Sequence, residues 1–173
     1  MEDFLLLETH IHANELAFRD KVRNFVHENV IGNIDQAFED AEPMREYIKG
    51  MADLGVLGMT LPHKYGGHAA SYVAYGLVCQ ELEYADSSLR SFFSVQNSLC
   101  MFPIFVFGTP EQKAKWLPKM AKGEAIGCFG LSEVNAGSDP GSLQTTATKT
   151  RDGWEINGSK KWITNAPFAD VAI

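Results

Sequence analysis

The spacing of apolar residues changes near residue 124, and this change limits the possible folds more than any other feature of the sequence. Apolar residues before it recur at the three- and four-residue intervals of a helix, most clearly over residues 13–31. After it come a short apolar run at 126–131 and a run rich in β-branched residues at 145–150, separated by glycine-containing turns. The sequence therefore predicts an α+β protein, with an N-terminal all-α helical domain over residues 1–123 and the first strands of a β domain over residues 124–173.

Helix boundaries follow from capping residues. Proline favours the first helical position, Ser, Thr and Asp cap N-termini, and glycine commonly follows a C-terminus. The helix after Ser71 is apolar nearly all round in its first turns, which predicts a central position, and the next helix is expected to bend at Pro103. The residues with capping signals are Pro43, Ser71, Asp86 or Ser87, and Thr109 for predicted starts, and Gly55 and Gly123 for predicted ends.

Composition and charge argue against several classes of function. The chain of 173 residues has 45% hydrophobic and 21% charged residues, as expected for a globular protein. Its net charge of −7 argues against binding nucleic acid, and no apolar run approaches the ~18 residues of a membrane span. The cysteines Cys79, Cys100 and Cys128 are far apart in apolar surroundings and predict buried thiols in a reducing compartment.

Some polar residues resemble metal ligands or a catalytic base. His10 and His12 could share one side of an extended strand, but no third ligand follows nearby, so we predict no metal site. Glu133 lies among small polar residues, and we expect its carboxylate to accept hydrogen bonds from turn amides instead of acting as a base.

Two separated segments suit a flat ring system with a phosphate tail. The first, residues 127–139, is a short apolar strand followed by a loop of small polar residues, whose backbone N–H groups can approach an anion closely. The second, residues 157–165, is predicted to be a strand in which Trp162 offers an aromatic face and Thr164 a hydrogen bond at its edge. Two ordinary hairpin strands with turn residues are the alternative.

Together these segments resemble the flavin-binding strands of the acyl-CoA dehydrogenases. The resemblance implies FAD as cofactor, with Trp162 against the flavin, Thr164 facing its N5 atom, and Ser132 at its pyrimidine edge. Ser132 stands where the family usually has threonine and Val134 where proline is common, and both changes leave the hydrogen-bonding groups in place. Ser138 would serve the cofactor pyrophosphate or the CoA part of the substrate. The implied cofactor-binding residues are Phe129, Leu131, Ser132, Gly137, Ser138, Trp162, Ile163 and Thr164.

The family resemblance covers nearly the whole chain. Residues 47–67 look like the second helix and loop of these enzymes, and residues 109–118 and 122–124 look like the segment before their β domain. The resemblance implies a β-barrel-like middle domain, of which only the first strands are here, and a C-terminal helical domain that is absent from these residues. That absent domain would carry the glutamate base, so we expect this chain to be the front part of a longer protein.

Arg90 is the residue that best indicates what kind of substrate binds. It lies one turn into a markedly apolar helix, where burying a guanidinium without an anion partner is unfavourable. Ser94 follows four residues later on the same helical face, so the two side chains could hold a carboxylate. Alternatively, Arg90 pairs with an acidic residue near the start of its helix. The candidates are Glu81, Glu83 and Asp86.

Within the family, residues 88–98 are most similar to the glutaryl-CoA dehydrogenases. In those enzymes the matching arginine and serine hold the distal carboxylate of the substrate, which implies this role for Arg90 and Ser94. The implied substrate-binding residues are Arg90, Ser91, Ser94 and Ser138.

The resemblance implies α,β-dehydrogenation of an acyl-CoA thioester. A proton leaves the carbon next to the thioester and a hydride equivalent leaves the following carbon, which requires an electron sink such as a flavin. Glutaryl-CoA would lose carbon dioxide to give crotonyl-CoA, although non-decarboxylating relatives exist. The alternatives are a short- or branched-chain enzyme with a neutral substrate and a catalytically inactive truncated paralogue that only binds. The implied partners are an electron-transfer flavoprotein and further copies of the chain in a homotetramer, in the bacterial cytoplasm or the mitochondrial matrix.

Overall fold

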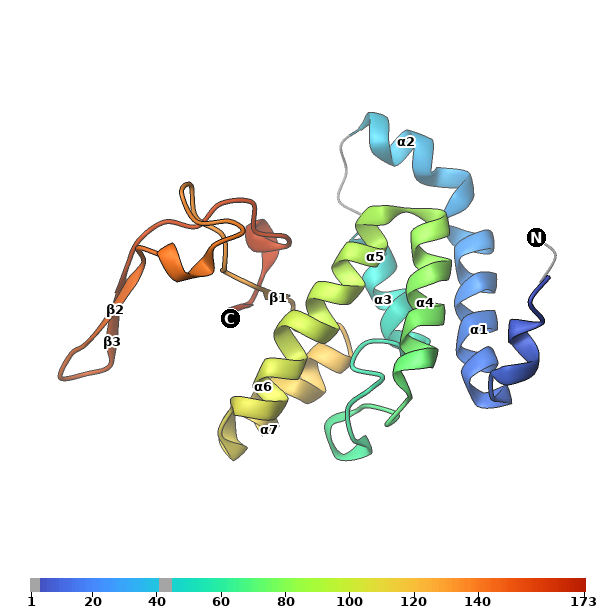
Figure 1. Ribbon diagram of the computed structural model, residues 1–173, viewed down its shortest axis with the longest axis horizontal. Coiled ribbons are helices and arrows are strands. Elements are labelled where there is room, and N and C mark those ends of the chain that lie inside the picture. The colour runs from blue at the N-terminus through green and yellow to red at the C-terminus, as the bar shows by residue number, and fades with distance from the viewer. Residues whose placement is uncertain (1–3, 41–44) are drawn as a thin grey trace.

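The computed structural model describes residues 4–40 and 45–173. Figure 1 shows a bundle of helices with a smaller β region at one end. The α-helices are α1 Ala13–Asn29, α2 Ile34–Glu39, α3 Glu46–Asp53, α4 Tyr72–Ala85, α5 Ser87–Ser94, α6 Phe102–Phe107 and α7 Pro110–Ala121. A π-helical segment, η4, spans Val95–Met101, and short 3-10 helices are η1 Leu7–His10, η2 Ile31–Asn33, η3 His63–Tyr65, η5 Pro140–Ser142 and η6 Ala166–Phe168. The strands are β1 Gly127–Cys128, β2 Thr146–Lys149, β3 Trp154–Asn157 and β4 Val171–Ala172. This order confirms the α+β prediction.

Three of the predicted capping residues cap their helices. The Ser71 hydroxyl accepts a hydrogen bond from the Ala74 backbone N–H at 3.1 Å and so begins α4. The Asp86 carboxylate accepts hydrogen bonds from two backbone N–H groups in the first turn of α5. At the start of α7, Thr109 and Gln112 exchange hydrogen bonds between side chain and backbone. Each interaction satisfies an N–H group that has no partner within its helix.

Glycines follow α3 and α7 as predicted. Gly55 has a φ of 73° and Gly123 a φ of 69°, the left-handed conformation that commonly terminates a helix. Pro43, the predicted start of α3, lies outside the described residues. α2 was not predicted, because it has only six residues; its N-cap residue, Asn33, makes no capping hydrogen bond.

Pro103 alters the helix before it without ending it. α5, η4 and α6 follow one another without a break. Proline lacks the N–H that would bond to the carbonyl four residues earlier, and its ring crowds that carbonyl. In η4 the turns are wider, and the Phe102 N–H donates to the carbonyl of Asn97, five residues earlier. The wider segment ends just before Pro103, the residue at which a bend was expected, and Pro103 itself lies in α6.

The core consists of two apolar clusters. The larger lies among α1, α3, α4 and α5 and includes Val22 and Phe93, both completely buried. The second lies where η4, α6 and α7 meet and includes Met101 and Leu117, also completely buried. Burying one such side chain contributes about 1.5–3 kcal/mol. Ile126, just before β1, packs into the larger cluster and attaches the β region to the helices.

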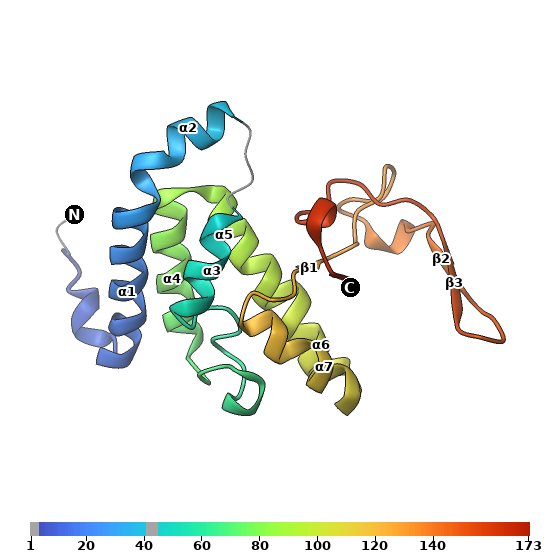
Figure 2. The same cartoon turned by 180° about the vertical axis from the view of Figure 1, so that it is seen from behind.

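α4 packs between α1 and α5, the central position that its sequence predicts (Figures 1 and 2). Its buried Glu81 receives two hydrogen bonds from Arg23 of α1, at 2.8 and 3.0 Å. The first turn is not enclosed, however, since Tyr72 is 72% exposed and Val73 is 52% exposed. The apolar character of this turn therefore does not correspond to burial within the described residues.

The β region has two pairs of strands. β1 and β4 are parallel, with Gly127 opposite Val171, whereas β2 and β3 form an antiparallel hairpin whose residues are all exposed. The strand predicted over 126–131 is only two residues long, because the chain turns directly after β1. In this turn the Leu131 N–H donates to the Phe129 carbonyl at 3.0 Å.

The strand predicted over residues 157–165 was wrong. β3 ends at Asn157, and residues 161–164 are neither strand nor helix. Trp162 has a φ of 60° and Asn165 a φ of 69°, and a left-handed residue cannot continue an extended strand. The alternation of apolar and polar residues in this segment therefore does not reflect a β-strand.

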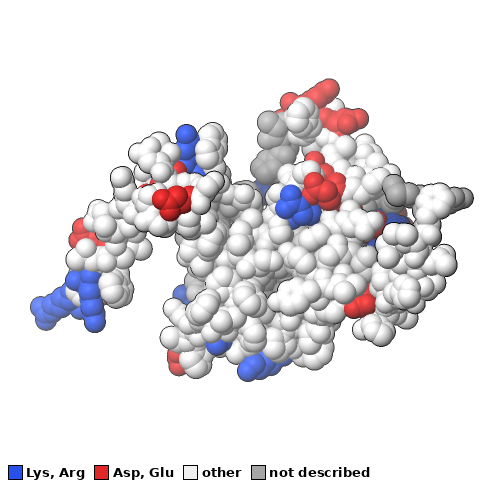
Figure 3. All heavy atoms as spheres, in the orientation of Figure 1, with Lys and Arg blue, Asp and Glu red and all other residues white. Residues whose placement is uncertain are grey.

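Acidic and basic side chains gather at two different places on the face of the molecule seen in Figure 3. Figure 3 shows acidic groups over the end formed by α2 and basic groups at the tip of the β2–β3 hairpin. The basic residues of the hairpin include Lys149 and Arg151. Among the described residues, no helix combines the length and apolar character needed to cross a membrane.

Alanine substitutions at two glycines should have opposite effects on stability. Gly58 has a φ of 72°, and a Cβ there would also displace the Met101 methyl group, 2.6 Å away, so Gly58→Ala should destabilise by about 1–2 kcal/mol, mainly through left-handed strain. Gly76 lies inside α4 with nothing within 4 Å of its Cβ position, so Gly76→Ala should stabilise by about 0.5–1 kcal/mol. Urea unfolding of both variants checks the signs, and a loss of stability in both would contradict this account.

Candidate functional site

The two polar segments identified in the sequence lie against each other. The Lys161 backbone N–H donates to the Ser132 carbonyl at 2.8 Å. The Lys160 ammonium donates to the Leu131 carbonyl at 3.0 Å, although 29 residues separate the two in sequence. In Figure 1 these segments form the irregular loops between β1 and the β2–β3 hairpin. The fold therefore brings both segments to one place.

Glu133 stabilises this group of loops. Its carboxylate accepts hydrogen bonds from the backbone N–H groups of Gln144 and Thr145 at 2.7 and 3.0 Å, from the Thr145 hydroxyl at 2.5 Å, and from Lys160 at 2.9 Å. These donors, the Thr145 hydroxyl above all, favour the charged form and lower the pKa of Glu133 to about 2. A carboxylate with so low a pKa is a poor base. The prediction of a structural role for Glu133 is confirmed.

The loop after Glu133 presents polar groups to solvent. A tight turn, in which the Glu133 N–H donates to the Ala136 carbonyl at 2.9 Å, leads into the exposed residues Gly137 and Ser138. The Asp139 carboxylate then caps η5. Within residues 4–40 and 45–173, the hydroxyl and the backbone N–H of Ser138 have no hydrogen-bond partner. Both groups are therefore available to an anionic ligand.

Trp162 is the most accessible aromatic group of the second segment. It is 84% exposed, with the Lys161 ammonium 4.7 Å from the centre of its ring. Its left-handed backbone costs about 1–2 kcal/mol, a strain of the kind that accumulates at functional sites. The hydroxyls of Ser132 and Thr164, like that of Ser138, have no hydrogen-bond partner in the described part of the chain. These groups together offer an aromatic face and several unpaired donors.

The remaining predicted cofactor residues differ in accessibility. Phe129 and Ile163 are half-buried, whereas Leu131 is 37% exposed. They lie next to the residues with available donors, since Phe129 and Leu131 precede Ser132 in the first segment. Their apolar side chains could contact a ring system without desolvating polar groups.

Arg90 and Ser94 meet on one face of α5. Arg90 Nη1 donates to Ser94 Oγ at 3.3 Å, and Arg90 Nε forms an ion pair with Glu83 of α4. The hydrogen bond to Glu83 raises the pKa of Arg90, and hydrogen bonds from Ser87 and Arg90 lower the pKa of Glu83. The Arg90 side chain is 36% exposed, and Ser91 is half-buried beside it. The Arg90 guanidinium is thus partly exposed and already has an anionic partner. That partner is Glu83, one of the three acidic residues considered from the sequence.

A row of polar side chains continues from Arg90 along both helices. The Tyr75 hydroxyl is hydrogen-bonded to the Ser98 hydroxyl at 2.8 Å, and the Tyr75 ring stacks on Phe93 with ring centres 4.9 Å apart. Burial raises the pKa of Tyr75 to about 12 and also raises the pKa of the Cys79 thiol. Most of this row was missed from the sequence, although its four-residue spacing was a usable signal. Its members are Tyr75, Cys79 and Glu83 on α4, and Arg90, Ser94 and Ser98 on the helix that follows.

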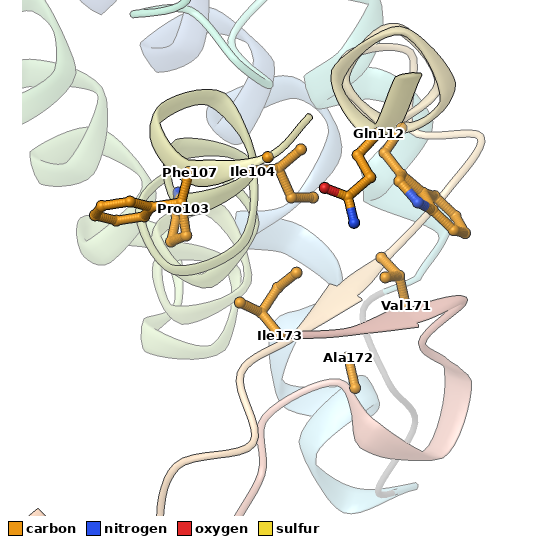
Figure 4. Close-up of a pocket in the computed structure, with 9 residues that line it drawn as sticks. Pro103, Ile104, Phe107, Gln112, Val171, Ala172 and Ile173 are labelled. Carbon is orange, nitrogen blue, oxygen red and sulfur yellow. The ribbon is translucent and has the colours of Figure 1, made fainter. Parts of the chain in front are cut away.

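An apolar cavity lies elsewhere, between α6, α7 and β4. Its volume is about 360 Å³. Figure 4 shows Ile104 and Gln112 of the helices facing Val171 and Ile173 across it. Among the described residues, those lining this cavity include none of the predicted cofactor or substrate residues. The cavity is therefore not part of the candidate site.

Histidines and cysteines form no site of their own in the described chain. No group of three or more His, Cys, Asp or Glu side chains there could hold a metal ion. The thiols of Cys100 and Cys128 are buried, as predicted, whereas Cys79 is half-buried.

A helical bundle followed by a β region with two paired polar segments is the arrangement expected of an acyl-CoA dehydrogenase. Comparison with known proteins leads to the same family. The family model described as "Acyl-CoA dehydrogenase, N-terminal domain" matches residues 12–124, and "Acyl-CoA dehydrogenase, middle domain" matches residues 128–173. The chain belongs to the acyl-CoA dehydrogenase family.

Individual relatives are similar over most of this chain. The human mitochondrial short-chain specific acyl-CoA dehydrogenase is 43% identical over 126 residues, which are 73% of this chain and 31% of that protein. A crystal structure of glutaryl-CoA dehydrogenase from Mycobacterium smegmatis matches with a TM-score of 0.93 and 47% identity, covering 99% of this chain and 44% of that one. Another crystal structure of glutaryl-CoA dehydrogenase from the same organism, in complex with FADH2, matches with a TM-score of 0.94 and 44% identity. It covers 98% of this chain and 44% of that one. The chain thus spans less than half the length of each relative.

Glu133→Gln should change how stability depends on pH. The pKa of Glu133 in the folded protein, about 2, lies below its ordinary value of 4.5, so the charged carboxylate stabilises the fold above pH 4.5. This stabilisation is lost as the pH falls from 4.5 towards 2. We expect the variant to be less stable than the parent at neutral pH, and the difference to shrink in acid. Urea midpoints measured across this range check it.

Glu155→Gln is the matched control, because Glu155 is an exposed carboxylate on β3. Its stability at neutral pH should match that of the parent. If the difference in stability between Glu133→Gln and the parent stays constant down to pH 2, the lowered pKa of Glu133 does not contribute to stability.

Proposed function

We propose that this chain is the front part of an FAD-dependent acyl-CoA dehydrogenase, with a helical domain over residues 1–123 and a flavin-binding β domain that begins at residue 124. The observation that carries the proposal is the hydrogen bonding between residues 131–133 and 160–161. It joins the two segments that resemble flavin-binding strands, residues 127–139 and 157–165, which we call the flavin-type segments. Membership of the family and the likeness to a glutaryl-CoA dehydrogenase solved with FADH2 support it.

The groups present in the two segments fit FAD. Trp162 offers an exposed face to the flavin ring, and the hydroxyls of Ser132 and Thr164 are unpaired donors for its polar edge. The unpaired N–H and hydroxyl of Ser138, next to Gly137, suit a pyrophosphate or the CoA part of the substrate. Bound FAD would accept the hydride equivalent that leaves the acyl chain.

The proton from the carbon next to the thioester needs a carboxylate base that is not already ion-paired. Glu133 and Glu83 do not suit this task, because hydrogen bonds lower the pKa of both and each is paired with a cation. We therefore expect the base in the C-terminal helical domain that acyl-CoA dehydrogenases have, outside these residues. The role of this chain is to hold the ring and the acyl group.

Glutaryl-CoA is the substrate that we propose, with loss of carbon dioxide to give crotonyl-CoA. Arg90 Nη1 and the Ser94 hydroxyl lie 3.3 Å apart, close enough for one carboxylate to contact both. The partial exposure of Arg90 lets an anion reach it, in competition with Glu83. Ser91, half-buried at the next position, would lie close to the same carboxylate.

A neutral short-chain or branched-chain acyl-CoA is the second candidate substrate. The ion pair between Arg90 and Glu83 favours it, because that pair already satisfies the guanidinium without a ligand. The similarity to the human short-chain enzyme also supports it.

Further expectations rest on family analogy. The electron acceptor would be an electron-transfer flavoprotein, and the assembly a homotetramer in the bacterial cytoplasm or the mitochondrial matrix. An inactive paralogue that only binds would retain FAD or acyl-CoA, but its flavin would stay oxidised when an acyl-CoA is added. Absorption spectroscopy of the full-length protein with an acyl-CoA separates these outcomes.

Trp162→Ala should weaken retention of FAD in the full-length protein, because an aromatic stacking contact worth about 0.5–1.5 kcal/mol is removed. Thr164→Val keeps the shape but lacks the hydroxyl, so it should shift the flavin spectrum or reduction potential. FAD occupancy after gel filtration and the visible spectrum provide the measurements. Trp154→Ala, at another exposed tryptophan, is the control and should match the parent. Unchanged occupancy, spectrum and potential in both site variants would remove these residues from the site.

Arg90→Gln should sharply lower kcat/KM for glutaryl-CoA. Removing the arginine partner of a buried carboxylate costs about 2–5 kcal/mol. Activity on butyryl-CoA should change much less, because that substrate has no second carboxylate. Flavin reduction with the two substrates side by side, for the parent and the variant, checks the difference.

The control for this experiment is Arg151→Gln, which removes an exposed arginine in the β2–β3 hairpin. It should leave the ratio of the two activities unchanged. An equal loss on glutaryl-CoA and butyryl-CoA in Arg90→Gln would make Arg90 a structural residue and favour the neutral substrate.

A further inference from the structure

The buried side chain of Gln96 joins the helices to the β region. Gln96 lies in η4 and is completely buried. Its Nε2 donates to the Ala125 carbonyl at 2.8 Å and to the Met120 carbonyl at 3.3 Å. Its Oε1 accepts a hydrogen bond from the Gly127 N–H at 2.9 Å. One side-chain amide thus contacts the end of α7, the loop after it and β1.

Asn165 bonds to the other polar group of the same glycine. Its Nδ2 donates to the Gly127 carbonyl at 3.1 Å, and the residue is only 7% exposed. Gly127 is therefore held through its N–H by one buried amide and through its carbonyl by another. We call these residues the Gln96–Gly127–Asn165 bridge.

The backbone of Gly127 lies directly against η4. A Cβ at this position would lie 2.6 Å from Cys100 Cβ and 3.0 Å from Met120 Cε, so any other residue would force β1 or η4 to shift. The contact leaves no space for β1 to move closer to the helix, and moving away would leave buried amides unpaired. The bridge therefore favours a single spacing between η4 and β1.

The bridge lies between the substrate-binding part of the proposed site and its flavin-binding part. Gln96 lies two residues after the end of α5, the helix with Arg90 and Ser94. Gly127 is the first residue of the first flavin-type segment, and Asn165 is the last residue of the second. We propose that Gln96 and Asn165 are positioning residues that set the distance between the substrate-binding helix and the flavin-binding segments, an inference that rests on the proposed function. They act through Gly127.

Gln96→Leu and Asn165→Gly test this role. Leucine is close to glutamine in size but has no amide, and glycine tolerates the φ of 69° at residue 165 while removing the side chain. Asn97→Ala is the matched control. Asn97 is also a buried amide in η4, only 4% exposed, but it bonds to Gly58 in the loop after α3 and to Phe93 in α5, neither of which lies in the β region.

Measurements on the apoprotein and on the full-length FAD-loaded protein separate positioning from stability. In the apoprotein, hydrogen exchange at the Gly127 amide should be faster in both bridge variants. In the loaded protein, both should alter the flavin absorption spectrum and slow its reduction by an acyl-CoA by roughly tenfold or more, with a smaller change in substrate Kd. Asn97→Ala should lower the Tm and leave spectrum and reduction rate at parent values.

Several outcomes would overturn the proposal. If exchange at Gly127 rises while spectrum and reduction rate match the parent, the bridge is only structural. The same conclusion follows if Asn97→Ala changes spectrum and rate as much as the bridge variants. If Gln96→Leu fails to fold, Asn165→Gly decides alone. A parent protein that binds no FAD would overturn the proposed function and the positioning role with it, whereas the exchange data on the apoprotein would still show what holds β1.

Discussion

The arrangement of this chain depends on a buried polar group that must find partners. The amide of Gln96 is enclosed among η4, α7 and β1, where a side-chain amide without hydrogen bonds is strongly unfavourable. It is satisfied by the carbonyls of Met120 and Ala125 and the N–H of Gly127. These groups lie on consecutive parts of the chain, so the end of α7 and the start of the β region must occupy their observed positions together. The apolar core stabilises the fold, and this amide selects one geometry for the junction.

Glu133 has the same effect within the β region. Its carboxylate collects donors from Gln144, Thr145 and Lys160, and so holds the first polar segment against the second. In the described part of the chain, the hydroxyls of Ser132, Ser138 and Thr164 in these loops have no hydrogen-bond partner. Loops that are cross-linked and still have available donors suit a binding site for a flat, phosphate-bearing cofactor, because less order must be imposed when the ligand binds. Buried polar contacts therefore organise the proposed site on both sides of the junction with the helices.

Local signals in the sequence predicted part of the fold and of the candidate site. The caps at Ser71 and Thr109 involve partners three residues away, so each capping sequence contains all that the interaction needs. The structural role of Glu133 was also predictable from its neighbours. The conformation of Trp162 was not, because alternating apolar and polar residues do not reveal a left-handed backbone. The helix α2 was missed because it has only six residues, too few for a clear helical pattern of apolar residues.

The sequence by itself determined the change from helices to strands near residue 124, several of the helix ends and the resemblance to the family, because these depend on residues close together in the chain. Only the tertiary structure decided that Arg90 pairs with Glu83 in addition to Ser94, since the three candidate carboxylates were equivalent in sequence. It also decided that Gln96 and Asn165 meet at Gly127, from 31 and 38 residues away. Such contacts depend on the path of the whole chain, because a buried polar group takes whichever partner the packing brings within reach.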